Sequence, residues 1–290
     1  MNLYFLIVLA DVFLVSVFCL QKKYQKLAGT KVDAVLTYNG LIGVFSAIIF
    51  FCINKFCFEL TPFSFLMGVF FCIAAVAYTC IGFKIIEKGN VSLYTLFLMS
   101  GGMVVPFVYG VFFLNEQMSF LRLFGLVLIV LAIGISNFKV NEIDFTQLFL
   151  CFAVFLLNGI VSVVSKSHQA CTMYEIVSPK GFVVLTSVLK AVMSFAALYV
   201  YKVTGKIETT KISLKPVIFI VVLSAACNGI SYLFQLIGAS SLPATVLYPL
   251  ITGGTIIITF LAELVIFREK LSLLQWISAL VCFAGTFMFL

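Results

Sequence analysis

Charged side chains are scarce in this sequence. Asp, Glu, Lys and Arg together make up 10% of the 290 residues, whereas soluble domains carry roughly 25%. This small number of charges cannot cover a water-exposed surface. The composition therefore excludes a soluble enzyme, a disordered chain and a nucleic-acid-binding domain.

Residues that support metal or cofactor chemistry are also few. The single histidine, His168, is expected in a solvated connection with no second imidazole near it, so no metal site is predicted. The nine cysteines form no C-x-x-C motif, and most lie in apolar runs, which indicates packing and not a disulfide framework. No G-x-x-x-x-G-K-[ST] motif occurs, so we expect neither ATP use nor a cofactor.

Apolar residues, by contrast, make up 63% of the chain, and the mean hydropathy is +1.22. At about 20 residues per crossing, this is enough for nine or ten transmembrane helices. The apolar runs predict ten spans, near 2–20, 32–53, 63–86, 91–114, 120–137, 145–165, 177–201, 215–237, 242–266 and 272–290. The first run lacks the basic start and cleavage site of a signal peptide, so we interpret it as a helix. A β-barrel is excluded because runs such as 124–132 do not alternate. The predicted fold class is an all-α polytopic membrane protein.

The basic residues predict an orientation. Thirteen lie in one set of connections, four lie in the opposite set (Lys55, Arg122, Lys166 and Lys180), and Lys190 lies within a span. The first set is Lys22, Lys23, Lys26, Lys31, Lys84, Lys88, Lys139, Lys202, Lys206, Lys211, Lys215, Arg268 and Lys270. Positive loops favour the cytoplasm, so ten spans place both termini outside.

Two segments of the chain resemble each other. Ser100-Gly-Gly is followed by a carboxylate at Glu116, and Thr252-Gly-Gly by one at Glu269, at nearly the same spacing. The chain therefore divides into two repeats of five predicted helices, residues 1–140 and 141–290. Because five is odd, the second repeat must be inverted in the membrane relative to the first, a design common in secondary transporters.

These motifs resemble the drug/metabolite transporter superfamily, and within it the EamA-type permeases. The second half carries Arg268-Glu-Lys-Leu-Ser, and the first carries Asn115-Glu-Gln-Met-Ser. The resemblance implies two inverted five-helix repeats and a permease function. It departs from the family at Asn115 and Arg268, where Gly is common, and many such permeases have both termini in the cytoplasm. On that point we follow the loop charges.

Two ionisable residues lie near the middle of predicted spans, where a charge is costly and a functional role is expected. Asp11 is a candidate proton or cation coupling site, and the small multidrug branch of the same superfamily carries a first-helix acid in a similar setting. Lys190 is a second transport or coupling candidate and is suited to an anionic group of the substrate. The alternatives are a structural Asp11–Lys190 ion pair, an Asp11 hydrogen bond to a neighbouring helix, and a Lys190 that snorkels.

Uncharged polar residues within the spans are candidates for a substrate cavity. They are Asn39, Asn158 and Asn228, each followed by Gly, together with Tyr94, Tyr232 and Tyr248. Packing between helices is the alternative for each of them. Glu116 and Glu269 recur at equivalent places, and a capping or gating role between the halves is favoured over substrate contact.

The leading hypothesis is a multi-pass cell-membrane permease for a small organic metabolite or drug, working by alternating access, with ion coupling, exchange or no coupling all open. The partners expected are a small-molecule substrate and the lipid bilayer; the sequence does not fix the oligomeric state, and a monomer is compatible with it. An intramembrane enzyme would need convergent acid, base or metal-binding groups, which the sequence does not supply. The second alternative is a lipid-handling or assembly protein without solute flux.

Overall fold

The computed structural model describes residues 3–29, 31–87, 91–136, 145–204, 214–265 and 272–290, and over these residues it consists of ten helices without strands. The helices are α1 (Leu3–Ala28), α2 (Val32–Ile53), α3 (Pro62–Glu87), α4 (Val91–Phe113), α5 (Phe120–Ser136), α6 (Phe145–Gln169), α7 (Pro179–Val203), α8 (Leu214–Ser241), α9 (Ala244–Val265) and α10 (Leu273–Phe287). The all-helical prediction is therefore confirmed.

Most predicted spans match an observed helix to within three residues, but α1, α6 and α8 extend four to eight residues further at their C-terminal ends. The sequence predicts the ends at the charged and turn residues that follow each apolar run. In α8 the added residues are Gly238-Ala-Ser-Ser241, which continue the helix without a charged residue. In α1 and α6 the added residues include Lys and Gln, which are good helix formers, so the helix continues through them. Lys166 and His168 consequently lie in the last turn of α6 and not in a connection.

Eight of the helices are long and apolar enough to cross a membrane, and α5 and α10 are shorter apolar helices. Their outer surfaces carry large apolar side chains: Phe149 is 66% exposed and Phe219 is 73% exposed. Such faces are unstable in water and fit a lipid environment. The chain is thus a multi-pass helical membrane protein.

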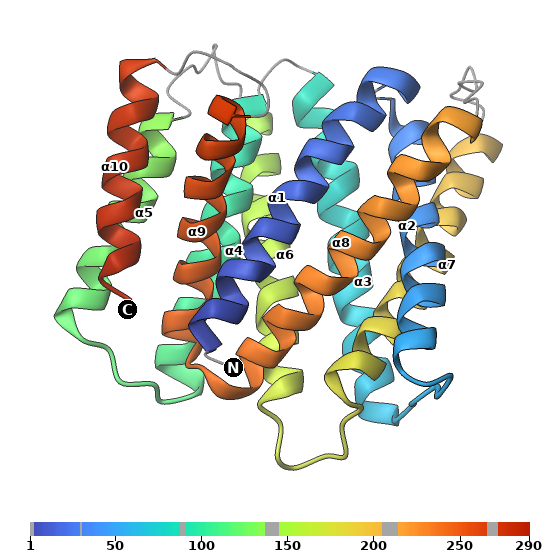
Figure 1. Cartoon of the computed structure of the whole chain (residues 1–290), viewed down its shortest axis with the longest axis horizontal. Coiled ribbons are helices and arrows are strands. Elements are labelled where there is room, and N and C mark those ends of the chain that lie inside the picture. The colour runs from blue at the N-terminus through green and yellow to red at the C-terminus, as the bar shows by residue number, and fades with distance from the viewer. Residues whose placement is uncertain (1–2, 30, 88–90, 137–144, 205–213, 266–271) are drawn as a thin grey trace.

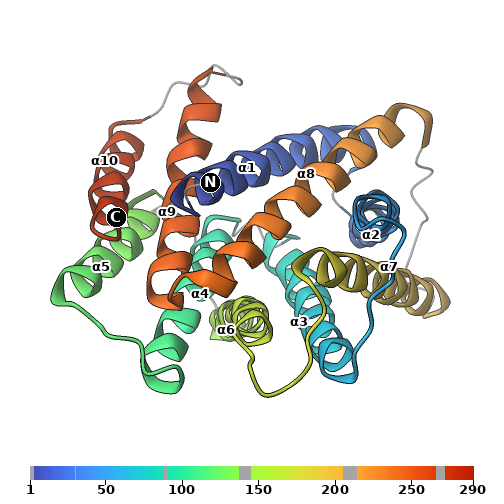
Figure 2. The same cartoon turned by 60° about the horizontal axis from the view of Figure 1, so that its bottom comes forward.

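The helices pair across the chain more than along it. In both views α1 lies beside α8, the α5–α10 pair forms one edge of the bundle, and α2 and α7 form the other (Figures 1 and 2). The helix α6 packs against α3 and α4, and α9 packs against α1 and α4. Helices distant in sequence therefore enclose the centre of the bundle together.

Glycines permit the closest of these contacts. A Cβ at Gly43 of α2 would lie 2.7 Å from the Ala191 nitrogen of α7. On α5, a Cβ at Gly125 would lie 2.8 Å from the Gly285 oxygen of α10, and one at Gly285 would lie 2.9 Å from the Gly125 oxygen. Lipid supplies no hydrophobic force between helices, so close backbone packing of this kind is a main source of their association.

The two ends of the bundle differ in charge. The helix ends that carry Lys22, Lys23, Lys26, Lys84 and Lys202 lie at the top in Figure 1, whereas both termini lie toward the bottom. The connection between α2 and α3, which contains the exposed Cys57, also lies at the bottom. The fold therefore gathers the described basic residues of the predicted cytoplasmic set at one end.

We predict that Cys57 faces the outside of the cell. In a variant with Cys52→Ser and Cys171→Ser, a membrane-impermeant maleimide applied to intact cells should label Cys57, and labelling should stop with Cys57→Ser. Lys23→Cys in that unlabelled background should react only after the cells are opened. The reverse pattern would contradict the orientation derived from the positive loops.

Candidate functional site

A cavity of about 330 Å³ lies at the centre of the bundle. Its volume is at the lower end of the range for small-molecule sites, which is about 300–1,000 Å³. Seven helices contribute to its wall, namely α1, α3, α4, α6, α7, α8 and α9. The α5–α10 pair contributes nothing to it among the described residues and closes one edge of the bundle instead.

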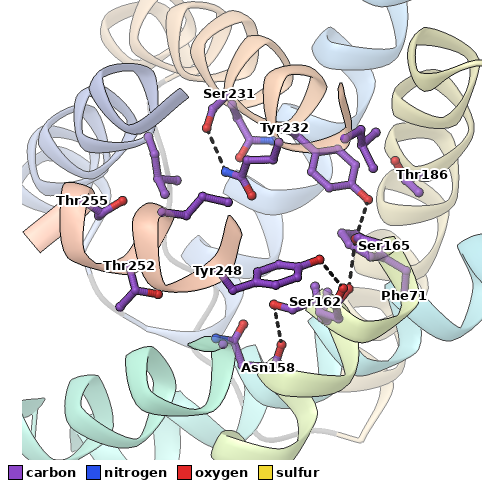
Figure 3. Close-up of a pocket in the computed structure, with 18 of the residues that line it drawn as sticks. Phe71, Asn158, Ser162, Ser165, Thr186, Ser231, Tyr232, Tyr248, Thr252 and Thr255 are labelled. Atoms are coloured by element: carbon purple, nitrogen blue, oxygen red, sulfur yellow. Dashed lines mark hydrogen bonds between the residues drawn. The ribbon is translucent and has the colours of Figure 1, made fainter. Parts of the chain in front are cut away.

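The cavity wall is rich in hydroxyl and amide groups (Figure 3). The polar residues of the wall are Tyr78, Asn158, Ser162, Ser165, Thr186, Ser187, Lys190, Asn228, Ser231, Tyr232, Gln235, Tyr248, Thr252 and Thr255. Aromatic surface is also present, since Phe71 packs against Tyr232 with ring centroids 5.3 Å apart. The cavity therefore suits a small solute that has both polar and apolar parts.

Hydrogen bonds between helices hold this wall in place. The Tyr232 hydroxyl of α8 lies 3.1 Å from the Ser165 hydroxyl of α6, and the Tyr248 hydroxyl of α9 donates to the Ser162 carbonyl of α6 (Figure 3). Within α8, Gln235 donates to the Ser231 hydroxyl at 3.1 Å. The tyrosines thus fix α8 and α9 relative to α6.

The polar side of each helix follows helical periodicity. On α8 the polar wall residues stand at Asn228, Ser231, Tyr232 and Gln235, which is the i, i+3, i+4, i+7 spacing of one helix face. Ser231, Gln235 and the serines of α6 are wall residues that the sequence predictions, which treat Asn and Tyr residues singly, do not include. A search for this polar stripe within each apolar run would have found them.

The structure brings together five of the predicted site residues. Lys190, Asn158, Asn228, Tyr232 and Tyr248 all line the central cavity. Lys190 also lines a second cavity of about 50 Å³, to which Asn39 belongs. Glu269 lies outside the described residues.

Tyr94 is absent from the described lining of both cavities, contrary to its prediction. It is the fourth residue of α4, and its ring packs against Gly82 of α3, where a Cβ would collide with it. It belongs to an apolar cluster with Ile85 and Val154. The missing side chain at Gly82 therefore determines where this ring lies.

Asp11 lies behind the cavity wall. Its side chain is 1% exposed, and its Oδ1 accepts a hydrogen bond of 3.2 Å from the Thr255 hydroxyl. Thr255 itself lines the cavity, and Gly254 allows the close approach of the other carboxyl oxygen. In the described part of the chain Asp11 forms no ion pair with Lys190, so of the structural alternatives the hydrogen bond to a neighbouring helix is the one observed.

Glu116 binds the N-terminus of α9. Its two carboxyl oxygens accept hydrogen bonds from the backbone nitrogens of Ala244 (2.7 Å) and Thr245 (2.8 Å). A carboxylate at this helix end satisfies two free N–H groups and interacts favourably with the helix dipole. The preceding Asn115 has φ of +51°, a left-handed conformation that Gly and Asn tolerate best, which accounts for Asn at a position where the resembling family commonly has Gly.

Lys166 and His168 are both buried in α6, so the predicted places of Lys166 in a connection and of His168 in a solvated connection were wrong. The Lys166 ammonium donates to the carbonyls of Ala239 (2.8 Å) and Leu242 (2.6 Å) at the end of α8. The His168 ring stacks on Phe182 at 3.8 Å, and its Nε2 lies 2.8 Å from the Ser64 hydroxyl. These partners replace the water that a connection would have supplied.

Glu59, in the connection between α2 and α3, binds the N-terminus of α7. It accepts hydrogen bonds from the Ser178 backbone nitrogen and hydroxyl, both 2.6 Å, and from the Asn54 amide at 3.0 Å. Partial burial raises the pKa of the Glu59 carboxyl, but these hydrogen bonds lower it by more, so the pKa lies below its ordinary value. Glu59 and Glu116 thus each join a connection to the start of a helix, α7 and α9 respectively, at the same end of the bundle (Figure 1).

Comparison with known proteins supplies a fold and no family. No family model and no curated protein matches the sequence. A solved structure described only as "Crystal structure of protein" is similar over 99% of this chain and 95% of its own, with a TM-score of 0.76 and 11% sequence identity. That identity is too low to carry function, so the likeness concerns the fold alone.

We predict that Glu59→Gln lowers thermal stability in a pH-dependent way. The lowered pKa means that ionised Glu59 adds stability above its unfolded pKa of about 4.3, and that this is lost as pH falls through the folded value. At pH 7 the melting temperature should fall by about 2–4 °C, the shift that about 1 kcal/mol produces in a large domain. At the lowest pH at which the fold persists, the difference in melting temperature between the variant and the wild type should be smaller, because the Glu59 carboxyl is then increasingly protonated. An equal difference in melting temperature at both pH values would contradict the role of the Glu59 charge. Glu175→Gln, which changes an exposed acid, is the control.

Proposed function

We propose that this chain is a secondary transporter that moves a small organic solute across the cell membrane by alternating access. The observation that carries the proposal is the cavity of about 330 Å³ between seven apolar helices, whose lining includes hydroxyl, amide and amine side chains. In a membrane protein, an ionisable side chain that faces a cavity inside the bundle, as Lys190 does here, is a functional-site candidate. The resemblance of the sequence motifs to EamA-type permeases agrees with this function.

The helix packing supports two inverted repeats of five helices. If each helix of the first half is exchanged with the helix five places later, the contact of α1 with α8 becomes that of α6 with α3. The contact of α4 with α6 becomes that of α9 with α1, and α2–α7, α4–α9 and α5–α10 map onto themselves. A pseudo-two-fold axis in the membrane plane would produce this pattern, with all ten helices crossing the membrane.

Individual contacts follow the same exchange. In the first contact, Gly125 packs on the Gly285 carbonyl. In the second, Ser278 donates to the Ala132 carbonyl at 2.7 Å. Ser278 lies 153 residues after Gly125 and is its counterpart in the second half. Gly285 in turn lies 153 residues after Ala132. The two contacts are therefore exchanged copies of each other, one made by backbone packing and the other by a hydroxyl.

Asp11 and Asn158 form a second exchanged pair. Asp11 of α1 packs against Gly254 of α9, and Asn158 of α6 packs against Gly102 of α4; in each case the glycine is the second of a Gly-Gly pair. Asn158 donates to the Leu98 carbonyl at 2.7 Å. A protonated Asp11 has the shape and hydrogen-bonding groups of this amide, whereas an ionised one does not. We therefore assign Asp11 as the proton-coupling site.

Gating is assigned to the end of the bundle that holds the termini. Lys166 binds the end of α8 and Glu116 binds the start of α9, so the turn between these helices is held from two elements by opposite charges. Release of these contacts would free α8 and α9, which together form much of the cavity wall. Glu269, as the counterpart of Glu116, remains a predicted gate at the other end.

Alternative functions are less well supported. An intramembrane enzyme would place several acid, base or metal-binding groups together, and the described residues contain no group of three His, Cys, Asp or Glu suited to a metal. A lipid-handling protein without flux is the remaining competitor, and it differs from a transporter in a direct measurement.

That measurement is solute flux in proteoliposomes. Proteoliposomes with the purified protein are preloaded, in separate preparations, with radiolabelled amino acids, organic acids, nucleosides or amines. At least one of these classes should exchange with external solute. Empty vesicles are the control. A folded protein that moves none of these classes, but transfers fluorescent phospholipid between leaflets, would overturn the proposal in favour of lipid handling.

For coupling, we predict that Asp11→Asn removes the dependence of net flux on a pH gradient while solute exchange continues. The amide reproduces the protonated carboxyl and the arrangement at Asn158, so the fold and the cavity are retained, and the melting temperature should change little. Glu175→Gln, an exposed acid in the connection after α6, is the control. A pH-driven flux that survives in Asp11→Asn would assign the coupling elsewhere.

A further inference from the structure

Lys190 stands at the junction of two cavities. It lines the central cavity of about 330 Å³ and the adjoining cavity of about 50 Å³, which we call the side chamber. The side chamber is lined by Leu36, Asn39, Ala75, Val76, Tyr78, Thr79, Lys190 and Ser194. Lys190 is the twelfth residue of the 25 in α7, near the middle of a membrane-spanning helix.

The side chamber holds polar groups that the protein leaves unpartnered. The Ser194 side chain is 0% exposed, and its hydroxyl has no hydrogen-bond partner. Among the described residues, no hydrogen bond or ion pair engages the Lys190 ammonium or the Asn39 amide either. Buried polar groups are normally satisfied, and the Ser194 hydroxyl is buried and unsatisfied. The Lys190 and Asn39 side chains, which are partly exposed, line the same small cavity, so the three donors together point to a ligand group that accepts hydrogen bonds.

Charge restricts the chemistry of that group. No Asp or Glu lines either cavity in the described chain, and Lys190 is the only Lys or Arg that does. A lone positive charge within a membrane protein is costly, and a bound anion offsets that cost. The surrounding groups are neutral, so they add hydrogen bonds without adding a second positive charge.

We propose that the transported solute is an organic monoanion whose carboxylate binds in the side chamber, to Lys190, Ser194 and Asn39. The remainder of the solute lies in the central cavity, against the rings of Phe71 and Tyr232 and the hydroxyl groups of the wall. A chamber of about 50 Å³ holds a group of a few heavy atoms, and one lysine matches one negative charge, so a carboxylate fits better than a phosphate dianion. This inference rests on the proposed transport function.

The two sets of groups are continuous along α7. Val183, Thr186, Ser187 and Lys190 share one helix face and line the central cavity, and Ser194 continues this face by one more turn into the side chamber. The close packing of α2 through Gly43 brings Asn39, one turn away, to the opposite side of the chamber. The donors of the carboxylate site therefore come from α2 and α7, and α3 forms the rest of its wall.

The test compares matched carboxylates and amides as probes. 3-Phenylpropionate, hexanoate and indole-3-acetate, each paired with its primary amide, are titrated into the full chain in lipid nanodiscs by calorimetry. We expect at least one carboxylate to bind ten- to a hundredfold tighter than its amide, the effect of a charge-assisted hydrogen bond. Equal binding, or no binding of any carboxylate by a folded protein, would overturn the proposal.

Variants locate the site. Lys190→Gln should abolish the preference for the carboxylate while the amide binds within about threefold of its wild-type affinity. Lys202→Gln removes the same charge from an exposed position in the last turn of α7 and should keep the full preference. Ser194→Ala should reduce the preference several-fold without altering charge, and it supplies the decision if Lys190→Gln fails to fold. A preference unchanged in both cavity variants would place the anion elsewhere.

Phenethyl phosphate and phenethylamine are titrated in the same way, as a dianionic probe and a cationic probe. Tighter binding of the phosphate than of the carboxylates would overturn the assignment to a monoanion, and tighter binding of the amine would overturn anion recognition altogether. The binding and flux measurements distinguish this inference from the proposed function. Lys190-dependent carboxylate binding without solute flux would contradict the transport function and leave the carboxylate site intact. Flux of a neutral or cationic solute, with no carboxylate preference, contradicts this inference alone.

Discussion

The absence of water inside a membrane governs this structure, because a polar group within the bundle is costly unless it finds a partner in the protein or in a bound ligand. Many hydroxyls bind a carbonyl one turn earlier on the same helix, as Thr79 does with Ala75 and Ser224 with Ile220. Others join two helices, as Ser46 does with the Ala225 carbonyl and Ser231 with that of Ala10. The first kind hides a polar group and the second kind fixes a helix pair.

The same constraint separates structural polar residues from candidate site residues. Lys166, His168 and Glu116 are all engaged by named partners, and their roles are to hold helix ends and connections together. Lys190 and Ser194 have no such partners among the described residues and face cavities instead. Charge within a span is therefore a weak guide to function until the partners of that charge are known.

This distinction explains what the sequence predicted and what it missed. The ten helices followed from apolar length, which is a local property, and Lys190 followed from its charge within a span. The burial of Lys166 did not, because its partners Ala239 and Leu242 are more than 70 residues away in the chain. Tyr94 was misplaced for a similar reason, since the gap that receives its ring exists only through Gly82 of another helix.

In the proposed inverted arrangement, the two halves share shape but differ in charge. A symmetric pair of repeats gives the inward and outward states nearly equal free energies, so a small difference between the repeats decides which state is populated. Asn158 offers a neutral amide at its position, whereas Asp11 offers a carboxyl whose charge changes with its proton. Likewise Lys190 places a positive charge in one half only, on the helix that pairs with α2. An anion at Lys190 and a proton at Asp11 would then act on the same balance from two different helices, and the coupling of solute to proton would need no direct contact between them.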